Sequence, residues 1–121
     1  MEPAITSGGT PGPRLADEWA GLDNNVYGSF TGSPPAKTIA ASFAAAGWRV
    51  RASSWTDFEV EREWVCLELR QLPDTVIFSG VVDPSRLDDL GTALAAAGLR
   101  YSVEFWDGEL SRAPDRTIRG G

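Results

Sequence analysis

The chain has 121 residues, of which 42% are hydrophobic and 23% are charged, and this is enough for one globular domain with its own core. A net charge of -6 argues against a protein that follows nucleic-acid phosphates, because such binding needs a clustered basic surface. A single cysteine, Cys66, and the absence of histidine exclude an internal disulfide and a zinc site of the usual Cys/His type.

The sequence also bears on where the protein acts. No stretch reaches the roughly 20 apolar residues of a membrane span, and the N-terminus lacks the basic and then apolar pattern of a signal peptide. We therefore expect no membrane contact and a cytoplasmic location. One lysine against ten arginines, together with many alanines and glycines, is typical of proteins from GC-rich bacterial genomes.

Residues 1–22 precede the predicted domain. Proline, glycine and serine dominate residues 1–13, and such a composition buries too little apolar surface to offset the entropy lost on ordering. This part is predicted to be a flexible tail. Leu15, Trp19 and Leu22 then recur at helical spacing and predict a short helix.

The first predicted elements are a strand, a helix and a second strand. Residues Val26–Thr31 form a short apolar and aromatic run, and Ser33 is the expected N-cap of a helix over residues 35–46. Gly47 occupies the position of a left-handed C-terminal cap. The following residues, Trp48–Ser53, alternate between apolar and polar, which predicts a half-buried strand.

The alternation of apolar and polar residues changes phase between Val60 and Val65. Phe58 and Val60 alternate with glutamates, but the parity shifts before Val65, Leu67 and Leu69, so a bulge or a turn must lie near residues 61–63. We predict one bent strand, because Glu-Arg-Glu lacks the Asn, Asp or Gly that tight hairpin turns favour.

The second half of the chain repeats this order. Residues 75–82 predict a central strand, Asp83 is the expected cap of a second helix, and Gly98 is expected to end that helix. A strand with Tyr101, Val103 and Phe105 facing inward comes next. Asp-Gly at 107–108 predicts a hairpin in which residues 109–113 pair back, and residues 115–121 are predicted to be loose.

The two halves match at an offset of 51 residues, which predicts an internal duplication. Both contain Ala-Ala-Ala-Gly, at residues 44–47 and 95–98, and apolar positions coincide on either side of it. With repeats at 26–70 and 75–113 in one domain, 23–114, we predict an α+β two-layer sandwich. Its mostly antiparallel sheet would carry two main helices on one face.

This strand-helix-strand-strand order, over about residues 26–112, resembles that of the duplicated GyrI-like domains. The resemblance implies binding of drug-like or cationic ligands on the open face of the sheet. The Glu104-Phe105-Trp106 run is similar to the carboxylate and aromatic pattern with which that family holds its ligands.

Alternation places a set of polar and aromatic side chains on the face away from the helices. Aromatic and arginine side chains often anchor recognition sites, so this set is a candidate binding surface. Two alternatives remain open, because Trp19 and Leu22 or a second subunit would convert the tryptophans into core residues. The set is Arg49, Arg51, Ser53, Trp55, Ser102, Glu104 and Trp106.

An acidic run is the second candidate surface. Asp57, Glu59, Glu61 and Glu63 alternate along a predicted strand, where they would steer a basic partner towards the protein. The alternative is a solvated face that prevents edge-to-edge aggregation.

Catalytic and cofactor signals are weak. Without histidine there is no Ser-His or Cys-His dyad, and Cys66 has no neighbour in sequence that would lower the pKa of its thiol. The glycines do not form a phosphate loop or a dinucleotide fingerprint. We therefore expect a protein that is not an enzyme and has no cofactor.

Three functional hypotheses follow. The first is a partner-binding protein similar in character to bacterial immunity proteins, which would occlude a basic toxin through Trp55, Glu104, Trp106 and the acidic run. The second is a GyrI-like domain that holds a small cationic ligand between Trp55 and Trp106 with the help of Glu104. The third is a structural homodimer formed through the sheet face.

Overall fold

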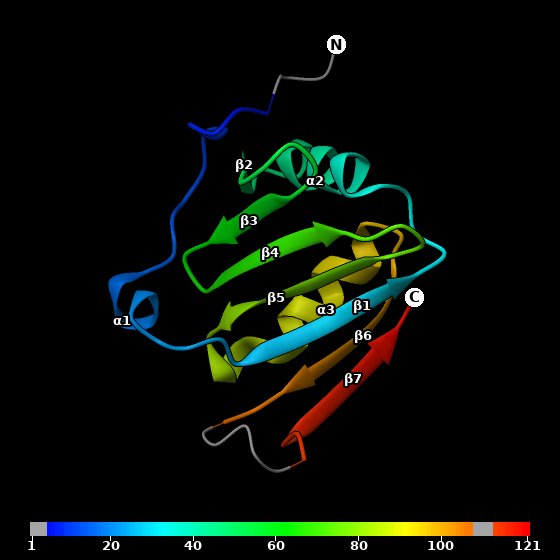
Figure 1. The fold of residues 1–121 in the computed structure, drawn as a ribbon. Helices are drawn as coiled ribbons and strands as arrows, with labels where there is room; N and C mark the ends of the chain where they lie inside the picture. Colours follow the sequence, from blue (N-terminus) through cyan, green and yellow to red (C-terminus); the bar gives the residue numbers. More distant parts are fainter. Residues whose placement is uncertain (1–4, 108–112) are drawn as a thin grey trace.

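A computed structural model describes residues 5–107 and 113–121. Its elements follow the chain from the short helix α1 to the edge strand β7 (Figure 1). The elements are α1 (Asp17–Ala20), β1 (Val26–Thr31), α2 (Ala36–Ala45), β2 (Arg49–Ala52), β3 (Phe58–Arg62), β4 (Val65–Gln71), β5 (Val76–Val82), the 3-10 helix η1 (Pro84–Arg86), α3 (Leu87–Ala96), β6 (Arg100–Phe105) and β7 (Arg116–Gly120).

The strands form one antiparallel sheet in the order β2-β3-β4-β5-β1-β6-β7. One of its apolar rows runs from Phe58 through Leu69, Phe78 and Gly28 to Val103. This row and the buried sides of α2 and α3 belong to one hydrophobic core. The predicted α+β two-layer sandwich is therefore confirmed, with α3 behind the sheet in Figure 1.

Gly28 belongs to this apolar row because a side chain there has no room. A Cβ at Gly28 would collide with the ring of Phe78, which packs against Phe30 at a centroid distance of 4.9 Å. The glycine thus lets the ring of Phe78 cross beneath β1 and fill the space between sheet and helices.

The C-terminal ends of α2 and α3 follow the predicted capping rules, whereas the N-terminal end of α2 does not. Gly47 and Gly98 adopt φ values of +91° and +77°, as predicted for C-terminal caps. The prediction for Ser33 was wrong, because Pro35 is the N-cap residue and the first free N–H, on Ala36, donates to Oε1 of Gln71 at 2.7 Å. A strand residue distant in sequence therefore caps α2.

Residues 61–63 do not bend one long strand, so that prediction was wrong. Arg62 pairs with Val65 across a two-residue turn of Glu63 and Trp64, which joins β3 and β4 as a hairpin. No described residue other than glycine has a positive φ, so this turn needs no Asn, Asp or Gly. Trp64 also anchors the turn, since it is buried and packs on Trp48 at a centroid distance of 5.9 Å.

The described residues near both ends, 5–13 and 115–121, are more ordered than predicted. Residues 5–13 are not a free tail, because Thr10 bonds to Val50 through its backbone N–H and its hydroxyl, and the Ala52 N–H donates to the Thr6 carbonyl. Edge strand β2 is thereby covered, and α1 confirms the predicted short helix. At the other end, β7 occupies residues expected to be loose, because β6 offers them an unpaired edge; the predicted strand at 109–113 lies largely outside the described residues.

The internal duplication stays a prediction. The helices α2 and α3 begin at residues 36 and 87, which reproduces the offset of 51 residues. Their crossovers differ, however, because β3, β4 and β5 lie between β1 and β2, whereas only β1 lies between β5 and β6. None of the helices in the described residues is long and apolar enough to cross a membrane.

Asn25 joins three strands at the start of β1. Its side-chain amide donates to the Val82 carbonyl at 2.8 Å and its Oδ1 accepts from the Val82 N–H at 2.9 Å. Its own backbone N–H donates to Gly80, and its carbonyl accepts from the Trp106 N–H, each at 2.9 Å. The ends of β5 and β6 are thus tied to β1.

We predict that Asn25→Ala lowers the free energy of unfolding by about 1–3 kcal/mol, because it leaves two partly buried backbone groups of Val82 unsatisfied. Urea unfolding measures this as a lower midpoint at unchanged slope. Asn24→Ala is the matched control, since Asn24 is exposed and its side chain bonds to no described residue, and a loss of equal size there would contradict the prediction.

Candidate functional site

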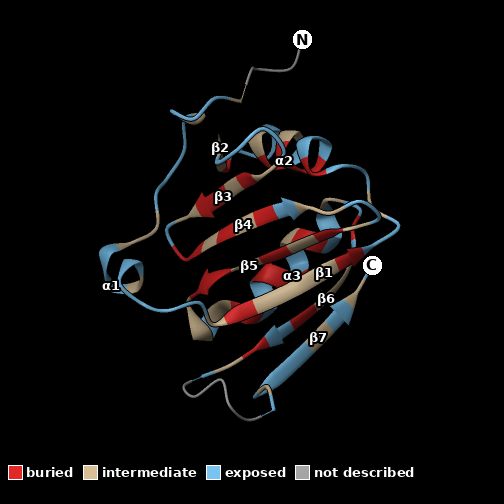
Figure 2. Ribbon diagram, viewed as in Figure 1, coloured by how far each residue is buried: buried red, intermediate tan, exposed pale blue. Residues whose placement is uncertain are grey.

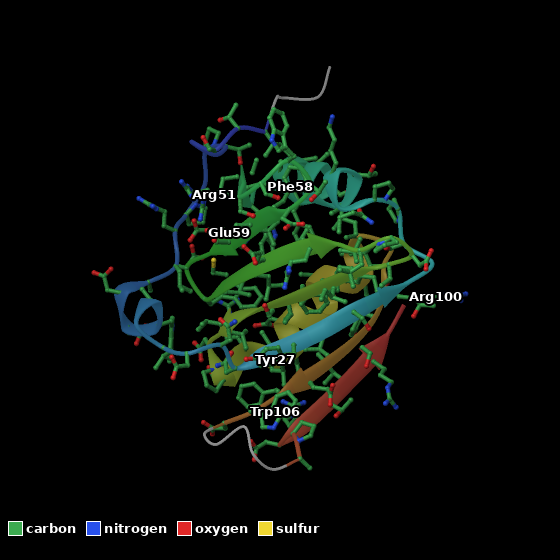
Figure 3. The ribbon with its side chains drawn as sticks, in the orientation of Figure 1. Tyr27, Arg51, Phe58, Glu59, Arg100 and Trp106 are labelled. Carbon is green, nitrogen blue, oxygen red and sulfur yellow. The ribbon has the colours of Figure 1, made fainter. Side chains whose placement is uncertain are left out.

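The open face, meaning the side of the sheet away from α2 and α3, begins at β2 with two arginine–glutamate pairs. Arg49 Nη1 lies 2.5 Å from Glu61 Oε1, and Arg51 holds both carboxylate oxygens of Glu59 at 3.0 Å. Arg51 and Glu59 lie side by side in Figure 3. The sequence placed these four residues in two separate candidate surfaces, whereas the structure joins them into one ladder of ion pairs across β2 and β3.

The N-terminal segment covers this ladder. The backbone N–H of Leu15 donates to Glu61 Oε2 at 2.9 Å, and the N–H of Ala16 donates to the Glu63 carbonyl at 2.9 Å. Glu61 is consequently only 6% exposed, and Val81 on the same face is also buried. The carboxylate stripe expected to meet a basic partner is therefore paired and shielded at Glu61, and Asp57 accepts hydrogen bonds from Gln71 and Thr56 instead.

Cys66 lies beneath the same segment. A depression of about 340 Å³ separates Leu15 and Leu22 from Cys66 and Glu68. Burial, and then the negative charge of Glu59 and Glu61, raise the pKa of the Cys66 thiol far above its ordinary value. A protonated thiol is a poor nucleophile, so the environment opposes a catalytic role for this residue.

The ligand atoms of Glu59, Glu61 and Cys66 lie within 4.8 Å of one another, which is close enough to contact one cation. Both carboxylates are already neutralised by Arg51 and Arg49. A metal ion would have to displace a guanidinium and deprotonate a thiol whose pKa is raised. The cluster therefore fits a structural ion-pair network better than a metal centre.

The two tryptophans of the predicted surface do not meet. Trp55 is fully exposed in the turn between β2 and β3, whereas Trp106 directly follows β6. The register places Phe58 on β3 level with Val103 on β6, and these two strands run in the same direction. Trp55 precedes this row by three residues and Trp106 follows it by three, so they lie at opposite ends of the sheet. The strands β3 and β6 are also four spacings apart, about 19 Å. The expectation of a ligand held between Trp55 and Trp106 was wrong, because strand order cannot be seen in the alternation pattern.

Trp106 has a different aromatic neighbour. Its ring meets Tyr27 edge to face, with centroids 5.6 Å apart and an interplanar angle of 84° (Figure 3). Tyr27 is paired in register with Glu104 on the adjacent strand, and their side chains point to the same face. A carboxylate therefore stands beside an aromatic pair at this end of β1 and β6.

A depression of about 390 Å³, the central depression, opens next to this group. Small hydroxyl side chains occupy its middle, and longer side chains stand around it. Figure 2 shows why it is open, since β1 is only half-buried along most of its length although it has a strand on either side. The residues around the depression are Tyr27, Gly28, Ser29, Arg70, Ile77, Phe78, Ser79, Ser102 and Glu104.

Two charged groups of the central depression have no charged partner in the part of the chain that the structure describes. Glu104 and Arg70 are both exposed, and neither forms an ion pair or a side-chain hydrogen bond with another described residue. By contrast, the arginines of β2 are paired. Sequence reasoning found Glu104 but missed Arg70 and Tyr27. The alternation of Glu68 and Arg70 with buried leucines in β4 was the available signal.

A second groove lies on the helix side. It has a volume of about 440 Å³ between α2 and α3, and alanines form most of its walls over Phe43 and Trp48. Arg62 closes one end, where its guanidinium lies 5.3 Å from the centroid of Trp48 and donates to the Ala46 carbonyl. This groove offers few polar groups with which to fix a ligand.

Comparison of the chain with protein-family models, with curated proteins and with solved structures gave no match. The geometry of the open face is therefore the basis for inferring a function.

The raised pKa of Cys66 predicts a specific pH dependence of stability. The folded protein keeps the thiol proton to higher pH than the unfolded chain, in which cysteine titrates near about 8.5. The stability that this group contributes is complete below that pH and is lost as the pH rises above it, by up to about 1.4 kcal/mol per pH unit.

Replacing Cys66 with Ser removes the titrating group while keeping a small polar side chain. We expect the free energy of unfolding, measured in urea between pH 8 and 10.5, to fall less steeply for Cys66→Ser than for the unsubstituted protein. Parallel curves for the two proteins would contradict the placement of the thiol.

Proposed function

We propose that this protein is a non-enzymatic binding domain that holds a small molecule with a cationic group in the central depression. The observation that carries the proposal is the carboxylate of Glu104, which no described residue pairs with, beside the Tyr27–Trp106 pair. A carboxylate next to an aromatic ring attracts a cation through both charge and the ring quadrupole. The cationic group would lie at the β1–β6 end of the depression.

The size and the lining of the depression suit a small ligand. Its volume of about 390 Å³ falls within the range of small-molecule sites, which is about 300–1,000 Å³. Ile77 and Tyr27 offer apolar contact, and Ser29, Ser79 and Ser102 offer hydroxyl groups. This combination supports a ligand that is partly apolar and partly polar, in agreement with the ligand class implied by the resemblance to GyrI-like domains.

Three observations favour binding over catalysis. The sequence contains no histidine, and its only thiol is held protonated by burial and by two carboxylates. Both oxygens of the buried carboxylate of Glu61 are engaged, since Oε1 accepts from Arg49 and Oε2 accepts from the backbone N–H of Leu15. General acid–base chemistry needs a group that can readily exchange a proton with substrate, and the environments of Cys66 and Glu61 oppose this role.

A second proposal is that the protein binds a protein partner, such as a bacterial toxin that it neutralises. One observation favours it, namely that Trp55 is fully exposed on an ordered turn. Ser54 Oγ accepts from the Asp57 N–H at 3.0 Å, and the Ser53 N–H donates to the Asp57 carbonyl at 2.9 Å. A tryptophan presented in this way is the residue type that most often anchors a protein interface.

The first proposal predicts that benzyltrimethylammonium, a small aromatic cation, binds the protein and that Glu104→Gln weakens this binding about tenfold, or 1.4 kcal/mol. Isothermal titration calorimetry at low salt measures both affinities. The substitution keeps the size of the side chain and removes only its charge.

Glu63→Gln and Trp55→Ala are the matched controls for this titration. The first removes the same charge from the exposed β3–β4 turn, and the second removes the exposed indole at the far end of the sheet. Both should leave the affinity for the cation unchanged. An equal loss with Glu63→Gln would show that net charge alone attracts the probe, and a loss with Trp55→Ala only would place binding at the turn.

A further inference from the structure

The central depression carries a second charged group that the binding of a cation leaves unused. Arg70 reaches the depression from β4, while Glu104 reaches it from β6. The register separates their backbones by three strand spacings across the sheet and two residues along it, about 16 Å in all, with Ile77 and Ser29 between them. One depression is therefore bounded by a guanidinium on one side and a carboxylate on the other.

Arg70 is one of three strand arginines, with Arg100 and Arg119, that form no ion pair or side-chain hydrogen bond with another described residue, and of the three only Arg70 lines the central depression. Arg49 and Arg51 are held by carboxylates, Arg62 lies over Trp48, and Arg86 lies over Trp64 and pairs with Asp89. Glu68 lies two residues before Arg70 on the same face, yet the two form no ion pair. Glu68 lines the depression beneath the N-terminal segment instead.

We infer that the ligand of the central depression is a zwitterion, with its cationic group at Glu104 and an oxyanion group, such as a carboxylate, at Arg70. The inference rests on the proposed function, because it adds a second contact to the same site. The planar guanidinium of arginine matches an oxyanion with two parallel hydrogen bonds, which an isolated surface charge does not provide. The three serine hydroxyls between the charged groups suit a polar middle section of the ligand.

The charge pattern also opposes ligands of a single sign. A dication would place a positive group beside Arg70, and a dianion would place a negative group beside Glu104. Placing two like charges next to each other disfavours binding. Arg70 and Glu104 together therefore select against both dications and dianions. The central depression should therefore bind a zwitterion more tightly than a singly charged analogue of the same size.

Two probes of matched size test the inference, namely 4-(trimethylammoniomethyl)benzoate and its methyl ester. Both carry the same cation on the same ring, and only the first has a free carboxylate. We expect the unsubstituted protein to bind the benzoate at least about tenfold more tightly than the ester in calorimetric titrations at low salt. Arg70→Gln should bring the benzoate to the affinity of the ester while leaving the ester unchanged, and Glu104→Gln should weaken both.

Arg100→Gln is the matched control. Arg100 lies on the open face at the start of β6, but it does not line the depression, and Figure 3 shows it at the far end of the sheet. Circular dichroism checks that each variant, altered only at an exposed position, remains folded.

The results of these titrations distinguish the zwitterion inference from the proposed cation site. Equal affinity for benzoate and ester, with no effect of Arg70→Gln, overturns the zwitterion inference and leaves the cation site standing. An equal effect of Arg100→Gln also overturns it, because a general positive field would then explain the preference. Failure of both probes to bind the unsubstituted protein removes the proposed function and the inference together.

Discussion

The continuous register of the sheet is the constraint on which the rest of the structure depends. Strand side chains alternate strictly, so one register assigns every residue of β1 to β7 to the helix side or to the open face. The apolar row from Phe58 to Val103 fixes that assignment, because a slip of one residue would expose it and bury charges. The polar face is therefore a consequence of core formation as much as a binding surface.

The open face is divided by the N-terminal segment. Residues 5–16 bond to β2 and to the β3–β4 turn, so they protect an edge that would otherwise invite another strand. They also cover the ladder in which Arg49 and Arg51 neutralise two glutamates. Beyond this cover, from β4 to β6, the face carries small side chains and two charges, Arg70 and Glu104, that pair with no other residue in the described ranges. The central depression thus lies where the cover ends.

Much of the fold is predictable from the sequence because it depends on local rules. The alternation of residues 48–53 and 100–106 placed Arg49, Arg51 and Glu104 on one face, and glycines at 47 and 98 marked the helix ends. The β3–β4 hairpin was missed because its turn is stabilised by the packing of Trp64 on Trp48, a tertiary contact rather than a turn signature.

The candidate site was predicted less well, because it depends on strand order. The sequence gives no indication that β5 and β4 lie between β1 and β3, and this order separates Trp55 from Trp106. The same order brings Arg70 to the depression that contains Tyr27 and Glu104. Alternation identifies the face on which a side chain lies, whereas pairing between strands determines its neighbours. Arg70 was therefore visible as an outward residue but not as part of a site.

The most direct test of the central depression is a map of the backbone amides that respond to a bound cation. In ¹⁵N chemical-shift titrations with benzyltrimethylammonium, we expect the largest changes at residues 27–29, 77–79 and 102–104, which lie along β1, β5 and β6. Residues 53–56 and the two main helices should change little. Changes concentrated in the groove between α2 and α3, or at the Trp55 turn, would contradict a binding site on the open face of the sheet.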